Sequence, residues 1–143
     1  MSIEFWEDRS RKIIKPDLFS SVAESVAKEI AKVSNDRMNT PTQIRKFYDE
    51  VLNLKGIVRD QNYEFNKILP YVKMLHAKSA YSFERGLVSK EFKEFISTIV
   101  NNVNSNDDFE VMVSFFEAFM GFYKYEYEVK KIERKNSYQG NRR

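Results

Sequence analysis

The chain has 143 residues and a formal net charge of +3, with 42% hydrophobic and 15% aromatic residues and no cysteine. This composition is sufficient for one domain with a real core, and it excludes general disorder, a disulfide framework and thiolate metal sites. The N-terminal residues mix acidic with apolar side chains, unlike a signal peptide, and no apolar run approaches the roughly 18 residues that span a bilayer. We therefore expect a cytoplasmic protein with no membrane partner.

The charge is distributed unevenly along the chain. Residues 1–40 are neutral, residues 41–90 carry +4, residues 91–127 carry −5, and residues 128–143 carry +4. Such separation can orient a charged partner through the field of the protein, although scatter over a solvated surface is an equally good explanation for counts this small.

The first predicted helix follows an N-terminal arm of residues 1–16. Pro16 and Asp17 open it, and apolar residues then recur at helical spacing until the polar stretch "SNDRMN". The apolar residues of this helix are Leu18, Val22, Val26, Ile30 and Val33.

The second predicted helix, within residues 40–56 and extending toward residue 58, has the clearest start. Thr40 is an expected N-cap, Pro41 suits the first helical position, and Gln43 completes a capping box. Its expected buried stripe is Ile44, Phe47, Tyr48, Val51, Leu54 and Val58. Three cations, Arg45, Lys46 and Lys55, lie between these apolar positions.

Two further helices are predicted between residues 65 and 103. The third runs from about residue 65 to 85, with Pro70 either in its first turn or at a kink and Gly86 just beyond its end. Ser89 caps the fourth. The residues that face inward from the fourth helix are Phe92, Phe95, Ile96, Ile99 and Val103.

The fifth predicted helix begins at Asp107 and Asp108, which suit the positive end of a helix dipole. Apolar residues cover most of its circumference, which is typical of a central core helix or of one shared with another chain. The expected architecture is all-α, a compact bundle of about five helices over residues 17–127, followed by a basic tail of residues 128–143 that we expect to fray.

The sequence offers little for catalysis. His76 is the one histidine, no ligand spacing surrounds it, and no glycine-rich phosphate loop is present. Adjacent acidic pairs such as Asp49 and Glu50 point about 100° apart on a helix, so they do not converge on one metal. We therefore expect no enzyme activity, no cofactor and no metal.

A nucleic-acid contact fits the third helix better. Lys78, Tyr81 and Arg85 lie at positions i, i+3 and i+7, and Lys73 and Lys67 precede them. Cations with an interposed tyrosine can bind phosphates while the ring packs on a sugar or base. On the pattern alone, solvated cations with Tyr81 in the core are the commoner explanation.

Four segments in order resemble the small subunit of type III-A CRISPR–Cas effector complexes, an antiviral defence system. They are "TPTQIRKFYDEV", "ILPYVKMLHAKSAYSFERG", "EFKEFI" and "DFEVMVSFFEAFMGFYKY", and they cover roughly residues 38–125. The resemblance implies a non-catalytic helical subunit that stacks in several copies, associates with the backbone subunits, and helps to hold the guide and target RNAs.

The resemblance maps onto Arg45, Lys46, Lys78, Tyr81 and Arg85, as residues that face RNA or that the structure requires. Lys73 is added from its place on the third helix, and the protein interface from the surplus of aromatic residues in the last helix. Arg45, Lys46, Lys73, Lys78, Tyr81 and Arg85 are expected to face RNA, and a protein interface is expected at Phe115, Phe119 and Phe122. The competing hypothesis is a helical module that homodimerises through its Phe-rich last helix and binds no nucleic acid.

Overall fold

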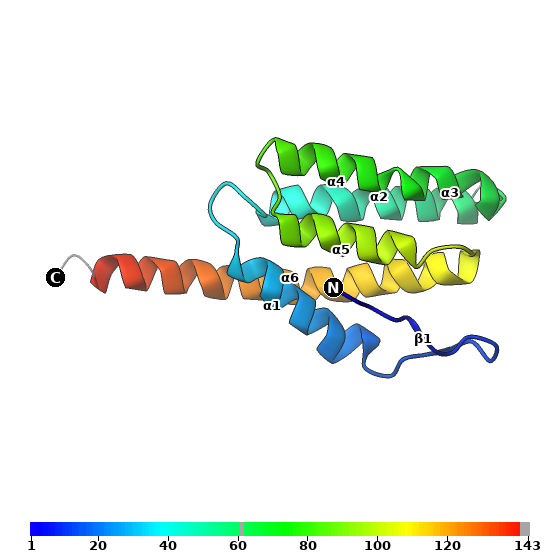
Figure 1. The fold of residues 1–143 in the computed structure, drawn as a ribbon, viewed down its shortest axis with the longest axis horizontal. Helices are drawn as coiled ribbons and strands as arrows, with labels where there is room; N and C mark the ends of the chain where they lie inside the picture. The colour runs from blue at the N-terminus through cyan, green and yellow to red at the C-terminus, as the bar shows by residue number, and fades with distance from the viewer. Residues whose placement is uncertain (61, 141–143) are drawn as a thin grey trace.

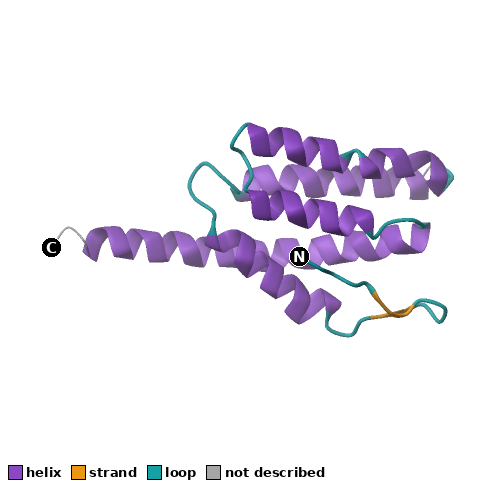
Figure 2. Cartoon of the chain, viewed as in Figure 1, coloured by secondary structure: helices purple, strands orange, loops and turns teal. Residues whose placement is uncertain are grey.

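The computed structural model describes residues 1–60 and 62–140, and it confirms the predicted all-α class. Helices form one elongated bundle, and the last helix extends beyond it at one end (Figures 1 and 2). No helix in the described part of the chain combines the length and apolarity that a membrane span needs.

The N-terminal segment forms a small β-hairpin that the sequence did not predict. Strand β1 (Trp6–Asp8) pairs antiparallel with β2 (Ile13–Ile14). The Asp8 carboxylate accepts hydrogen bonds from the Ser10 hydroxyl and the backbone N–H of Arg11, and these bonds close the turn. Ile3 and Phe5 are buried in the core, so residues 1–16 are part of the packed domain.

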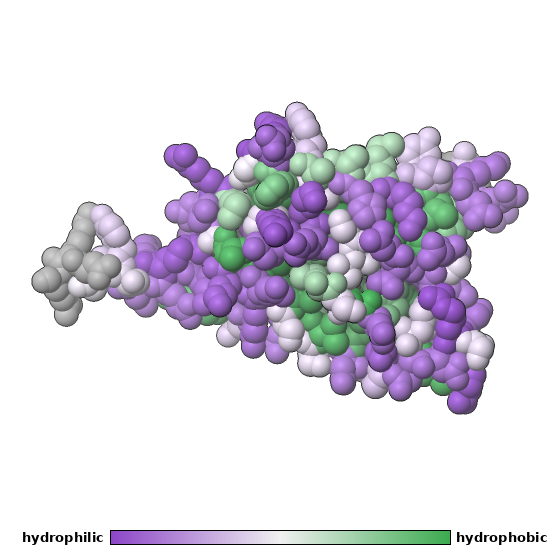
Figure 3. Space-filling model, viewed as in Figure 1, coloured by the Kyte–Doolittle hydropathy of each residue, from purple (hydrophilic) through white to green (hydrophobic). Residues whose placement is uncertain are grey.

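The first predicted helix is confirmed as two joined segments, the π-helical turn η1 (Leu18–Val22) and α1 (Ala23–Lys32). On the face drawn in Figure 3, most of the surface is hydrophilic, and hydrophobic residues show mainly between α1 and the N-terminal segment.

Helix α2 (Pro41–Asp60) begins where the capping pattern places it, because the Thr40 hydroxyl accepts a hydrogen bond from the backbone N–H of Gln43.

The third predicted helix is divided into α3 (Phe65–Lys73) and α4 (Leu75–Glu84). Pro70 lies inside α3 and has no N–H for the preceding turn, and the interruption follows one turn later at Met74.

Helix α5 (Lys90–Asn101) starts at the predicted cap, since the Ser89 hydroxyl accepts from the backbone N–H of Phe92. Asn39 fixes this cap from a distant loop. Its amide donates to the Ser89 hydroxyl and its amide oxygen accepts from the Ser89 backbone N–H, both at 2.8 Å. The hydroxyl of the buried Tyr123 donates in turn to the Asn39 carbonyl.

Helix α6 (Asn106–Gly140) is the central element of the core and packs on α1, α2 and η1. Phe115 and Phe119 are fully buried, and the Phe119 ring stacks on Phe95 of α5 with centroids 4.6 Å apart. Two rings with no exposed surface cannot contact a second chain, so the interface prediction does not fit Phe115 and Phe119. Phe122 is partly buried, and its place in a protein interface stays a prediction.

The expected fraying of the tail is not what the structure shows for residues 128–140, which continue α6. Arg134 accounts for part of this order. Its guanidinium donates to the Ser34 carbonyl at 2.9 Å and lies over the Tyr127 ring. Figure 1 shows the end of α6 projecting past the other helices. The rest of the predicted tail, residues 141–143, lies outside the described residues.

Candidate nucleic-acid interface

A hollow of about 280 Å³ lies between α2 and α4, and the predicted cations of both helices meet there. Lys46 comes from α2, whereas Lys78 and Tyr81 come from α4. Gln43, Lys46 and Glu50 share one face of α2 because they are three and four residues apart, and Lys78, Tyr81 and Ser82 lie within one turn of α4. The full lining is Gln43, Lys46, Phe47, Glu50, Leu75, Lys78, Tyr81 and Ser82.

An ion pair joins the two helices across this hollow. The Lys78 ammonium is 3.1 Å from the Glu50 carboxylate, and both side chains are partly exposed. Lys46 is exposed and has no carboxylate within ion-pair distance in residues 1–60 and 62–140. Its charge is therefore available to a ligand.

Arg85 extends the positive surface beyond the hollow. Its guanidinium carbon is 5.5 Å from the centroid of the Tyr81 ring, which is a cation–π distance. Tyr81 is 65% exposed, so the alternative that placed this ring in the core is wrong. Lys46, Lys78 and Arg85 against the single carboxylate of Glu50 give this group of residues a net charge of +2.

Two of the predicted RNA-facing residues lie elsewhere. Arg45 points to another side of α2, where it pairs with Asp49 at 3.7 Å and lines a second hollow of about 490 Å³ against α6. Lys73 faces α5, and its ammonium donates to the Val100 carbonyl at 2.9 Å. Burial lowers the pKa of Lys73 despite the opposing effect of Asp108, which indicates a structural role.

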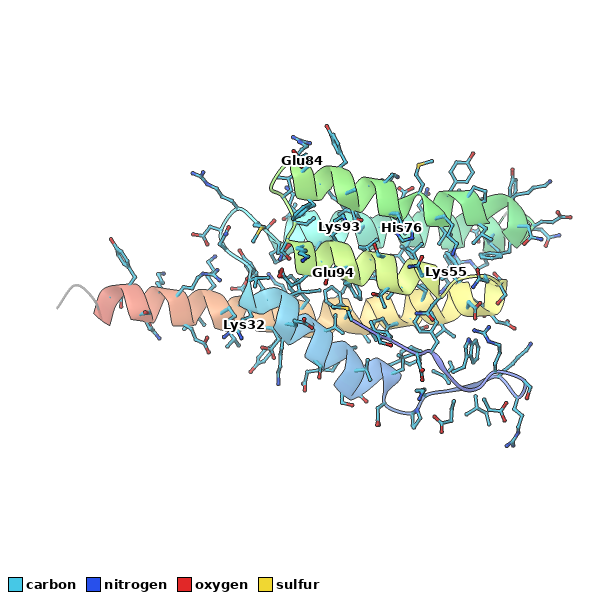
Figure 4. The ribbon with its side chains drawn as sticks, viewed as in Figure 1. Lys32, Lys55, His76, Glu84, Lys93 and Glu94 are labelled. Atoms are coloured by element: carbon cyan, nitrogen blue, oxygen red, sulfur yellow. The ribbon has the colours of Figure 1, made fainter. Side chains whose placement is uncertain are left out.

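The structure adds residues that the sequence reasoning left out. Gln43, Glu50 and Ser82 line the hollow with the predicted cations. The spacing of Gln43, Lys46 and Glu50 on one face of α2 was a usable signal, but nothing in the sequence indicated that α4 would face it. Lys55 lies toward the other end of α2 and lines a different hollow with Arg59 and Glu110 (Figure 4).

His76 lies between α4 and α5 (Figure 4). Its Nδ1 is 3.2 Å from the Ser97 hydroxyl and its Nε2 is 3.2 Å from the Asn101 amide oxygen. Both ring nitrogens thus have partners on α5, as expected of a histidine that joins two helices. Within the described residues, no group of three or more His, Cys, Asp or Glu side chains is arranged to hold a metal ion.

Comparison with known proteins identifies the family of the chain. A family model described as Csm2 Type III-A matches residues 15–129, a span that contains both helices of the hollow. No curated protein and no solved structure matches the chain. The resemblance drawn from the sequence motifs is confirmed by the family model. The chain belongs to the Csm2 family, the small subunits of the type III-A CRISPR effector complex.

Proposed function

We propose that this subunit binds RNA without catalysing a reaction, and that the hollow between α2 and α4 is where it does so. The observation that carries the proposal is the convergence of Lys46 and Lys78 in one hollow, with Arg85 and the exposed Tyr81 ring beside it. These three cations are placed to pair with phosphates of a strand that passes over the α2–α4 face.

Phosphate contacts suit a complex whose guide RNA can have any sequence. Lys and Arg side chains that pair with phosphates position a strand without reading base edges, so they supply affinity without sequence preference. The net charge of +2 in this group of residues is modest, and we expect an isolated subunit to bind RNA weakly.

Stacking of several copies would compensate for this weak contact. Neighbouring copies along one guide–target duplex convert each further contact into an intramolecular event, so their small affinities combine as avidity. The partners in this proposal are the guide RNA, the target RNA, the backbone subunits and other copies of the chain, all in the cytoplasm.

The competing hypothesis, a homodimer built on the Phe-rich helix, is less well supported. Phe115, Phe116 and Phe119 already pack against Phe95 within the chain. Exposing them to a second copy would remove large apolar surfaces from the core, which would destabilise the fold.

A double substitution tests the RNA proposal. Lys46→Ala with Arg85→Ala removes two exposed cations, and neither side chain makes a hydrogen bond or ion pair within residues 1–60 and 62–140. We expect weaker RNA binding and a salt dependence that is less steep by about 1.4, because each phosphate contact on a single strand contributes about 0.7 to the slope of log K against log salt. Fluorescence anisotropy at several salt concentrations measures both quantities, for the subunit alone and within the reconstituted complex.

The matched control is Lys55→Ala with Lys93→Ala, which removes the same charge from positions away from the hollow (Figure 4). The control should retain most of the affinity. Equal losses in both double variants would mean that overall charge, and not this site, governs binding.

A further inference from the structure

The floor of the α2–α4 hollow is apolar, although its rim is charged and polar. Phe47 and Leu75 line the hollow; Leu75 is fully buried, so of the two only Phe47, which is 7% exposed, has surface that a ligand can contact. A phosphate group is strongly hydrated and gains nothing from an apolar floor. The hollow therefore has a feature that phosphate binding leaves unexplained.

The Tyr81 ring is the second such feature. A ring that is 65% exposed gains little from burial, and the Arg85 guanidinium occupies one of its faces. Because the ring also lines the hollow, it offers an aromatic wall next to the apolar floor. Exposed aromatic rings beside cations are the usual platforms on which the bases of an unpaired strand stack.

The size and the rim of the hollow restrict the ligand further. Its volume of about 280 Å³ lies just below the range of small-molecule clefts, roughly 300–1,000 Å³, so it suits one planar ring system. The Gln43 amide and the Ser82 hydroxyl each donate and accept hydrogen bonds. Such a rim can satisfy the polar edge of any of the four bases, which agrees with a sequence-independent contact.

We propose that the hollow receives one unpaired base of the RNA strand whose phosphates contact Lys46, Lys78 and Arg85. The base would lie against the Tyr81 ring and over the exposed part of Phe47, with its edge toward Gln43 and Ser82. This inference rests on the proposed function and names its ligand more closely, as a nucleotide whose base has left the stack.

Abasic oligonucleotides separate the base from the phosphates. We would compare a short RNA with an abasic RNA of the same length, using wild-type protein, Tyr81→Ala and Tyr81→Phe. Base stacking on an aromatic side chain is commonly worth about 10-fold in affinity. We expect wild type to prefer the RNA with bases by about that factor, Tyr81→Ala to lose the preference, and Tyr81→Phe to retain it.

A second variant tests the hollow itself. Ser82→Leu adds an apolar side chain to the rim, and we expect it to reduce binding of the RNA with bases while leaving binding of the abasic RNA unchanged. A melting temperature close to that of wild type would show that the helices are intact. If Ser82→Leu leaves both affinities unchanged, the base does not enter the hollow.

The outcomes distinguish this inference from the proposed function. If wild type binds both RNAs equally and Lys46→Ala with Arg85→Ala weakens both, phosphate binding stands and the base site is wrong. The same conclusion follows if Tyr81→Ala weakens binding of both RNAs equally, since the ring would then act only by holding Arg85. If wild type binds neither RNA, the proposed function fails.

Discussion

Asp108 is the residue that fastens the N-terminal hairpin to the bundle. Its buried carboxylate accepts hydrogen bonds from the Trp6 indole N–H at 2.8 Å, the Arg9 guanidinium at 2.7 Å and the backbone N–H of Asn104 at 3.0 Å. The first two donors lie about one hundred residues earlier in the chain. One side chain thus joins the hairpin, the α5–α6 loop and the start of α6.

The ionisation of Asp108 should make stability depend on pH. Burial alone would raise its pKa, but the hydrogen bonds from Trp6, Asn104 and Arg9 outweigh burial and lower the pKa below its usual value. A carboxylate whose pKa is lower in the folded state stabilises the fold above the unfolded pKa of about 3.9. This contribution is lost as the pH falls through the lowered folded-state value.

Asp108→Asn tests this dependence through the free energy of unfolding in urea between pH 7 and pH 3. We expect the variant to lose about 1–3 kcal/mol at pH 7, because the donors from Trp6 and Arg9 lose a charged acceptor. We also expect its stability to change less than that of wild type as the pH falls. Asp107→Asn is the control, because Asp107 is half-exposed and, among the residues that the structure describes, pairs only with Lys12, at 3.4 Å. Parallel pH curves for wild type and Asp108→Asn would contradict the assignment.

The sequence could not separate these two aspartates. Both Asp107 and Asp108 fit the first turn of a helix, and that local reason is correct for each. What distinguishes Asp108 is its contact with Trp6 and Arg9, which depends on how the hairpin folds back. The local sequence therefore shows the place of Asp108 in the first turn of α6, but not its contact with the hairpin.

Among the helices, α6 contains a glycine that no contact within the chain requires. Gly121 is exposed, and a Cβ added there would meet nothing within 4 Å. Glycine inside a helix costs about 0.8–1.0 kcal/mol relative to alanine. At Gly86, by contrast, the backbone requires glycine. This residue follows the end of α4 with a φ of +74°, a backbone conformation that residues with a Cβ rarely adopt.

Gly121→Ala should therefore stabilise the isolated subunit by about 0.8–1.0 kcal/mol, and Gly86→Ala should destabilise it by about 1 kcal/mol. Chemical denaturation measures both changes. A loss of stability in Gly121→Ala would show that its neighbourhood is tighter than the structure shows.

At the same scale, nearby residues predicted the starts of α2 and α5 and the alternative of a kink at Pro70, but not the hairpin or the helical tail. Thr40 and Ser89 cap α2 and α5 as their sequences indicate, because capping involves residues within one turn. The division at Met74 follows Pro70 by one turn, whereas the hairpin and the helical residues 128–140 depend on distant partners. Arg134, for example, donates to a carbonyl one hundred residues away.

For the whole molecule, α6 is held to the N-terminal part of the chain at two distant points. Near its start Asp108 binds the hairpin, and farther along Tyr127 and Arg134 donate to the carbonyls of Asn35 and Ser34. The loop between α1 and α2 is thereby tied to the projecting part of α6. The direction of that projection depends on these contacts.

Arg134→Ala should free this loop. We expect a loss of about 1 kcal/mol in stability, since the guanidinium is partly exposed, and faster hydrogen exchange at the backbone amides of residues 34–38. Lys135→Ala removes the neighbouring charge, which has no such partner among the described residues, and should leave exchange unchanged. Unaltered exchange in Arg134→Ala would mean that the remaining contacts, from Tyr127 to Asn35 and from Tyr123 to Asn39, are sufficient to hold the loop.

The candidate site was predicted only in part, because it also depends on contacts between residues that are far apart in the sequence. The spacing of Lys78, Tyr81 and Arg85 fixed their common side of α4, but the rotation of α2 against α4 comes from packing of the whole bundle. Arg45 and Lys46 are neighbours in sequence and point about 100° apart, so only Lys46 reaches the hollow. Lys73 was indistinguishable from a surface cation until its distance to the Val100 carbonyl was known.

The central place of α6 has a consequence for biosynthesis. A ribosome releases the chain from its N-terminus, so α1, α2 and α5 emerge before the rings of Phe115, Phe116 and Phe119 that cover them. Until residues 106–127 leave the exit tunnel, the apolar faces of these earlier helices have no partner. The nascent protein therefore closes its core late, and until then it exposes apolar surface of the kind that promotes aggregation.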